Sequence, residues 1–136
     1  MYEILPHTAD IRIKATGASL EEFFVEMMRG MFAAAKVQPA RNHAKENAKS
    51  REIQLTAPDK EVLLVDFLNE ALYLGDTNKE IYEDAKFSKF AEKEVEGELV
   101  GRPRESVGVQ VKAATYHGLK IEEKGGVYEA TVIFDI

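Results

Sequence analysis

The residues best suited to chemistry lie near the two ends of the chain. Asp10 closes the run His7-Thr8-Ala9-Asp10, at the point where an alternating apolar segment begins. Asp135 is the penultimate residue of an apolar segment, and the α-carboxyl group of Ile136 adds a second negative charge one residue later. If the strand that begins at Asp10 lies beside the last strand, three carboxylates share one small region.

Such a cluster needs compensation for its own repulsion. Two unit negative charges about 4 Å apart repel each other by roughly 4 kcal/mol at an effective dielectric constant of about 20. The three carboxylates are therefore protonated, paired with Arg12 or Lys14, or bound to a divalent cation, and an all-oxygen set favours Ca²⁺ or Mg²⁺ over zinc. The residue types leave an alternative open, in which Asp10 caps a turn and Asp135 is an exposed charge at a strand end.

Other kinds of active site have little support in the sequence. Cysteine is absent, which excludes thiol nucleophiles, thiolate zinc sites and disulfides. No phosphate-binding loop or dinucleotide-binding glycine pattern occurs. The histidines, His7, His43 and His117, are far apart and lack the spacing of a helical zinc site. We keep His7 and His117 as accessory groups beside the carboxylates, with turn residues as the simpler interpretation.

The composition of the chain limits which classes of protein it can belong to and which kinds of partner it can bind. The 136 residues, 45% of them hydrophobic and 31% charged, predict a single domain over residues 1–136 that folds without a disulfide or structural metal. The net charge of −6 argues against strong direct binding to nucleic acid. No apolar run approaches the roughly 18 residues that cross a bilayer, and the N-terminal residues do not form a signal peptide. We therefore expect no membrane partner and a cytoplasmic location.

Two helices and several strands must position the carboxylates. Alternating apolar residues predict strands over residues 2–5, 10–17 and 52–57. Ser19 and Glu22 form a capping box before an amphipathic helix, and Asp59 caps a second helix that we expect to end before Gly75. The polar segment from Lys36 to Ser50 is predicted to be a loop, with a short helix around residues 44–48 as the alternative.

The C-terminal half of the chain is predicted to be mainly strands. A strand from Ile81 to Ala91 needs a bulge to place Phe87 and Phe90 on one face. Further strands are expected before a break at residues 102–104, over residues 107–113, and over residues 128–134 after a Gly-Gly hairpin turn at 125–126. The fold class that follows is α+β: two amphipathic helices packed on a curved, largely antiparallel or mixed β-sheet.

The same end motifs make the chain resemble the archease family. The resemblance spans nearly the whole chain and depends on residues 2–5, 7–11, 19–22, 112–119 and 132–136. It implies an accessory protein rather than an enzyme, because archeases activate the RtcB-type RNA ligase of tRNA splicing, promote its guanylylation and allow multiple turnover. Carried over by motif, the family's metal site implies Asp10, Asp135 and Ile136 as ligands, with calcium as the expected ion and magnesium or manganese as alternatives.

Two other functions are compatible with the sequence. A small metal-dependent phosphoester hydrolase would hold its metal with Asp10 and Asp135 and use His7 or His117 as general base. A chaperone-like binding module would instead contact its partner through the polar segment from Lys36 to Ser50. The family pattern matches this chain only loosely over residues 79–103, and Arg12 stands where members often have a small residue.

Overall fold

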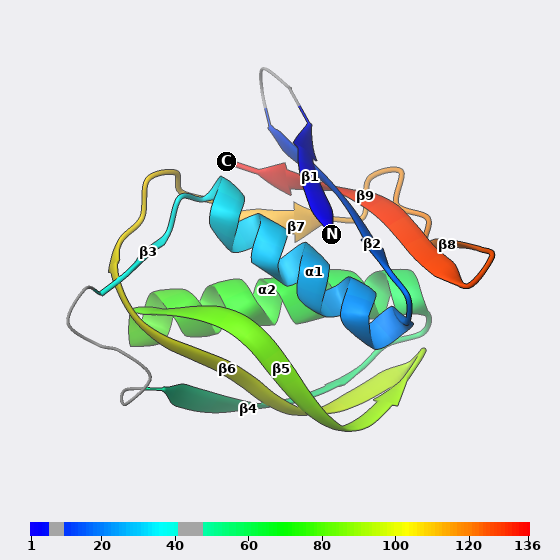
Figure 1. Ribbon diagram of the computed structural model, residues 1–136, viewed down its shortest axis with the longest axis horizontal. Helices are drawn as coiled ribbons and strands as arrows, with labels where there is room; N and C mark the ends of the chain where they lie inside the picture. The colour runs from blue at the N-terminus through cyan, green and yellow to red at the C-terminus, as the bar shows by residue number, and fades with distance from the viewer. Residues whose placement is uncertain (6–9, 41–47) are drawn as a thin grey trace.

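The computed structural model describes residues 1–5, 10–40 and 48–136 of the chain. Two helices form a layer between two antiparallel sheets (Figure 1). In chain order the elements are β1 Tyr2–Leu5, β2 Ile11–Gly17, α1 Leu20–Ala34, β3 Gln38–Pro39, β4 Lys49–Thr56, α2 Lys60–Asn78, β5 Glu80–Ala91, β6 Glu94–Ser106, β7 Ala113–Thr115, β8 Glu122–Lys124 and β9 Val127–Asp135. The predicted α+β class is confirmed.

The strands divide into two sheets that lie on opposite sides of the helices. The first sheet has the order β1-β2-β9-β7, and β8 also pairs with β9. In the second sheet β3, β4 and β5 each pair with the long strand β6. α1 contacts β2 of the first sheet and β5 of the second, and α2 contacts β7, β4 and β5. Because each helix touches both sheets, the helices make up much of the core.

The start of α1 follows the predicted capping box with one change. The Ser19 hydroxyl accepts a hydrogen bond from the backbone N–H of Glu22 at 3.1 Å. The Glu22 carboxylate in turn accepts from the N–H of Ala18, one residue before the cap, at 3.0 Å. The first bond satisfies a donor that the helix itself leaves unpaired, and the second ties the residue before the cap to the first turn of the helix. The local sequence therefore determines where this helix begins.

The prediction that α2 ends before Gly75 is wrong. The Asp59 cap is confirmed, since its carboxylate accepts from Val62 N–H at 2.8 Å. The helix, however, continues to Asn78 and ends at Lys79, which has φ 57° and donates its N–H to the Gly75 carbonyl. A Cβ atom at Gly75 would lie 3.0 Å from the Glu80 carbonyl oxygen, so glycine serves close packing inside the helix. Within the described residues no helix is long and apolar enough to cross a membrane.

The predicted bulge in β5 is confirmed. The register between β5 and β6 shifts between Phe87 and Lys89, and the rings of Phe87 and Phe90 lie 4.9 Å apart on the helix side. Phe90 also contacts Phe24 of α1 at 5.1 Å, and Phe87 contacts Phe67 of α2 at 6.0 Å. One extra residue in the strand thus lets two aromatic side chains three positions apart enter the same core.

The predicted break of β6 at residues 102–104 is wrong. β6 continues to Ser106, and Pro103 lies opposite Glu80 in β5. The Pro103 carbonyl still accepts from Ala40 N–H at 3.0 Å, because proline removes only the donor of its own residue. The polar segment from Lys36 to Ser50 also contributes β3 and the start of β4. The question of a loop or a short helix falls mainly on residues 41–47, outside the described residues.

The strand predicted over residues 107–113 is also wrong for most of its length. Gly108 and Val109 donate their N–H groups to the Ala35 carbonyl at 3.1 and 2.9 Å, so this segment bonds to the end of α1. Only Ala113 and the two residues after it form β7. The Gly-Gly turn is confirmed: Gly125 and Gly126 have φ 59° and 81°, which a two-residue hairpin turn of type I′ requires.

A buried charge pair joins β4 and β5 across β6. Glu80 is 2% exposed, and both of its oxygens accept from the Arg51 guanidinium at 2.8 Å. The Tyr82 hydroxyl donates to the same carboxylate at 2.8 Å. The hydrogen bonds from Arg51 hold the pKa of Glu80 below its ordinary value, while burial and the Glu80 carboxylate raise the pKa of Tyr82. Glu80 therefore stays ionised inside the protein.

Candidate functional site

The register between β2 and β9 brings the two end segments together. Ile13 lies opposite Val132, and Ile11 lies opposite Phe134. The pairing ends at Ile11 and Phe134, so Asp10 and Asp135 directly flank the last pair on the two strands. The end of β9 accordingly lies beside the start of β2, as the sequence predicted (Figure 1).

Both aspartates belong to the outer face of the first sheet. Successive side chains of a strand point to opposite faces. Ile13 and Phe134 are fully buried against the helices, so Asp10 and Asp135 point to the other face, away from the core. Asp10 is half-buried and Asp135 is exposed. The Asp135 carboxylate therefore lies where an ion or a partner protein can reach it, whereas the Oδ1 atom of Asp10 is buried.

Lys14 lies on the same face but is engaged elsewhere. Its ammonium group is 2.6 Å from a carboxylate oxygen of Glu129 in β9. The hydrogen bond to Glu129 raises the pKa of Lys14 and lowers that of Glu129. Of the two cations that the sequence offered as counterions for the aspartates, Lys14 already has a different partner.

The third strand of the site holds β9 from its other side. Ala113 of β7 lies opposite Asp135, and the N–H of Lys112 donates to the Asp135 carbonyl at 2.8 Å. The Thr115 hydroxyl donates to the Ile133 carbonyl at 2.9 Å. The backbone of Asp135 is thus held by β7, and the residue before it, Phe134, pairs with both β2 and β7. The Asp135 side chain takes no part in these bonds.

Asn69 of α2 supports this arrangement, and the sequence analysis missed it. Its side-chain oxygen accepts from Ala114 N–H at 2.8 Å, and its amide nitrogen donates to the Ala114 carbonyl at 3.3 Å. One side chain thus satisfies both backbone groups on the outer edge of β7. The available signal was a single amide in a stretch of α2, from Leu63 to Leu72, whose other polar residues are the acidic Asp66 and Glu70.

The donor set of this site fits a hard cation. Carboxylate oxygens are the ligands that Ca²⁺ and Mg²⁺ prefer. Within the part of the chain that the structure describes, no group of three or more His, Cys, Asp and Glu residues is placed to hold a metal. A cation bound by the two aspartates would therefore need a further oxygen ligand, for which the sequence predicted Ile136, a residue that is 44% exposed.

Of the two histidines predicted as accessory groups, the structure describes only His117. His117 is exposed and lies beyond Thr115, at the end of β7 away from the Asp135 pairing. The structure therefore does not bring His117 beside the carboxylates. His7 lies outside the described residues.

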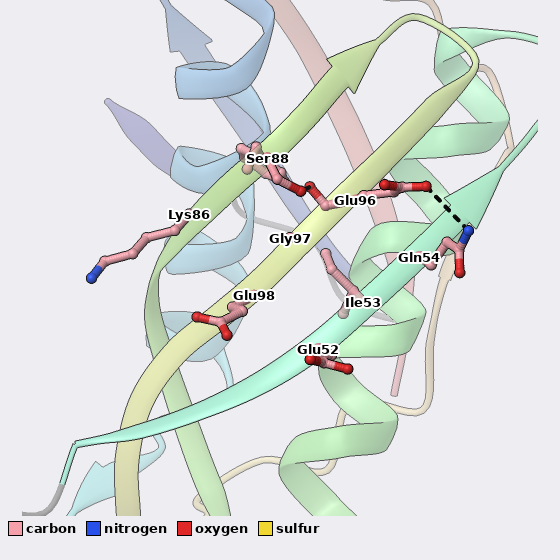
Figure 2. A pocket seen from close by; sticks show the side chains of 9 residues that line it. Glu52, Ile53, Gln54, Lys86, Ser88, Glu96, Gly97 and Glu98 are labelled. Atoms are coloured by element: carbon pink, nitrogen blue, oxygen red, sulfur yellow. Dashed lines mark hydrogen bonds between the residues drawn. The ribbon is translucent and has the colours of Figure 1, made fainter.

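A separate polar hollow occurs on the second sheet. It measures about 740 Å³ and lies over the middle of β4, β6 and β5 (Figure 2). Its polar lining residues are Glu52, Gln54, Lys86, Ser88, Glu96 and Glu98. Internal contacts already engage part of this lining: Gln54 donates to the Glu96 carboxylate at 3.2 Å, and Ser88 donates to the Glu96 carbonyl at 3.2 Å. None of the site residues predicted from the sequence lines this hollow.

Curated relatives match the chain over nearly its full length. The model of the Archease protein family (MTH1598/TM1083) matches residues 2–136. A protein archease from Methanosarcina mazei is 33% identical over 143 aligned residues, which cover 99% of this chain and 95% of the relative. A protein archease from Thermococcus kodakarensis is 32% identical and covers 90% of this chain and 88% of its own length.

Solved structures share the fold. The solution structure of protein 1598 from Methanobacterium thermoautotrophicum has a TM-score of 0.66 and 27% identity, and the match covers 99% of this chain and 98% of that one. A crystal structure from Thermotoga maritima, described as an archease and possible chaperone, has a TM-score of 0.67 and 24% identity, with 100% and 98% coverage. The family match and the full-length relatives together show that this chain belongs to the archease family.

Proposed function

We propose that this chain is an accessory protein that activates an RtcB-type RNA ligase in tRNA splicing, by promoting guanylylation of the ligase and its multiple turnover. Membership of the archease family supports this role. The observation that supports the proposal is the β2–β9 register, in which Ile11 pairs with Phe134, the sequence neighbours of Asp10 and Asp135. An exposed acidic site on a rigid sheet suits action on a partner's reaction centre.

The proposed ligands of a divalent ion are Asp10, Asp135 and the α-carboxyl group of Ile136. Calcium is the expected ion, with magnesium and manganese as alternatives. The protein supplies anionic oxygens on two neighbouring strands, and the backbone bonds from Lys112 and β2 keep Asp135 in place. When bound, the ion supplies positive charge that can stabilise an oxyanion.

A ligation assay tests the proposed function directly. The purified ligase is mixed with GTP, a divalent ion, an RNA with ligatable ends and this chain at a concentration below that of the ligase. We expect more guanylylated ligase and more than one ligation per ligase molecule. The control reaction omits only this chain. The absence of any gain across several metals and protein ratios would contradict the proposal.

Extending the chain beyond Ile136 tests the third ligand. A few added residues move the α-carboxyl group away while every side chain of the site is kept. We expect the affinity for the divalent ion, measured by calorimetry, to fall by at least about tenfold, because loss of groups that merely orient a ligand already costs about 10–100-fold. Ile136→Val, which keeps the terminal carboxyl group, is the matched control and should bind normally. Unchanged affinity in the extended chain would remove Ile136 from the ligand set.

A chaperone-like binding role is the second candidate, because the structural relative from Thermotoga maritima is described as a possible chaperone. The two roles differ in their need for the carboxylates. Protection of an unfolding client protein should not depend on Asp135, whereas ligase activation should be lost without it. Equal protection by wild type and Asp135→Asn, together with no effect on the ligase, would favour the chaperone-like role.

A further inference from the structure

Arg12 lies beside the two aspartates on the outer face of the first sheet. It occupies the position two residues after Asp10 on β2, and its cross-strand neighbours are Leu5 of β1 and Ile133 of β9. Asp135 is its diagonal neighbour, two positions beyond Ile133. Diagonal neighbours on one face are about 7–8 Å apart, which a long side chain can span. The register therefore places the Arg12 side chain on the same face of the sheet as Leu5, Ile133 and the aspartates.

The Arg12 guanidinium has no acceptor among the described residues. Its Nε atom is buried there without a hydrogen-bond partner. The other arginines in residues 10–40 and 48–136 each bind a carboxylate: Arg29 binds Glu26 at 2.6 Å, Arg51 binds Glu80 at 2.8 Å, Arg102 binds Glu83 at 2.6 Å and Arg104 binds Asp76 at 3.2 Å. A buried charged donor left without an acceptor is costly. Arg12 is thus prepared to bind an anion from outside the fold.

We propose that Arg12 binds a phosphate group together with the divalent ion held by Asp10 and Asp135. This inference rests on the proposed function, because it requires the ion. With the aspartates engaged by the ion, the terminal guanidinium nitrogens of Arg12 still offer N–H donors beyond the buried Nε. A phosphate group has several terminal oxygens, so one can contact the ion while two others receive the planar guanidinium fork. A single planar carboxylate has too few oxygens to do both in this way.

Binding to the isolated chain tests the proposal without any ligase. Ca²⁺ is titrated first, and inorganic pyrophosphate is then titrated into the ion-loaded protein, with calorimetry and backbone amide shifts as readouts. We expect Arg12→Gln to bind Ca²⁺ at least as well as wild type and pyrophosphate at least about tenfold more weakly. Arg12→Lys, which keeps the charge but loses the fork, should fall in between. Arg102→Gln makes the same charge change on the second sheet and should leave both affinities unchanged.

Three probes identify the source of the phosphate. Inorganic pyrophosphate, a nucleoside triphosphate and a short single-stranded oligonucleotide with a terminal phosphate are compared in wild type and Arg12→Gln. The probe that binds the wild type most tightly, and whose affinity falls most in Arg12→Gln, represents the natural class of phosphate ligand. Equal phosphate affinity in wild type and Arg12→Gln, or no phosphate binding with any probe, would overturn this inference. If the divalent ion still bound in that case, the proposed metal site would stand. A wild-type chain that binds no divalent ion would overturn both this inference and the proposed metal site.

Discussion

Asp135→Asn is expected to lower the divalent-ion affinity by at least about tenfold and to remove the stimulation of the ligase, while the fold stays intact. The substitution removes one negative charge and keeps the size of the side chain. The strand should survive, because β9 is held through the backbone bonds of Lys112 and β2 and not through the Asp135 carboxylate. Asp10→Asn should have the same two effects, since the proposed ion needs both aspartates.

Calorimetry and multiple-turnover ligation measure the two effects, and thermal unfolding checks the fold. Ion at about 100 times the wild-type dissociation constant should stabilise the wild type by about 2.7 kcal/mol, and at the same ion concentration this gain should fall to about 1.4 kcal/mol or less in both aspartate variants. Glu129→Gln is the matched control, because it makes the same charge change on the same face of β9, where Glu129 pairs with Lys14. Normal ion affinity in both Asp10→Asn and Asp135→Asn would show that the end motifs do not form the metal site.

Glu80→Gln is expected to reduce the free energy of unfolding at neutral pH by about 2–3 kcal/mol. Removing one partner of a buried charge pair costs about 3–5 kcal/mol, and the Arg51 side chain, 37% exposed, can recover part of this through water. The Tyr82 hydroxyl also loses its charged acceptor. Urea unfolding measures the change. Glu83→Gln is the control, since Glu83 forms an exposed pair with Arg102 and should cost less than about 1 kcal/mol.

Acid should reduce the effect of Glu80→Gln. Because Arg51 lowers the pKa of Glu80 in the folded state, the stabilisation is fully present above the ordinary pKa of 4.5 and is lost as the pH falls through the lowered value. The difference in stability between wild type and Glu80→Gln should therefore shrink below about pH 4.5, the unshifted glutamate value. A difference that stayed constant on acidification would show that the lost stability does not depend on the ionised carboxylate.

The local sequence determined the features that depend on near neighbours. Ser19 and Asp59 start their helices because their side chains bond to N–H groups three residues away. Gly125 and Gly126 form the hairpin turn because glycine, which has no Cβ atom, adopts the positive φ angles of this turn without strain. The spacing of Phe87 and Phe90 indicated a bulge, because three positions can share a face of a strand only with an extra residue. The alternation in β2 and β9 placed one set of side chains in the core and the other outside.

Only the tertiary structure decided the features that depend on distant partners. Gly75 is typical of a helix end and Pro103 of a strand end, but the first residue of β5 packs against Gly75 and pairs with Pro103. The sequence placed carboxylates near both chain ends, but the pairing of β2 with β9 brings these two end segments together, with Ile11 opposite Phe134. The same pairing leaves Arg12 beside the aspartates without an acceptor among the described residues. Hydrophobic periodicity records which face of an element is buried, whereas the neighbour on each side is set by long-range packing.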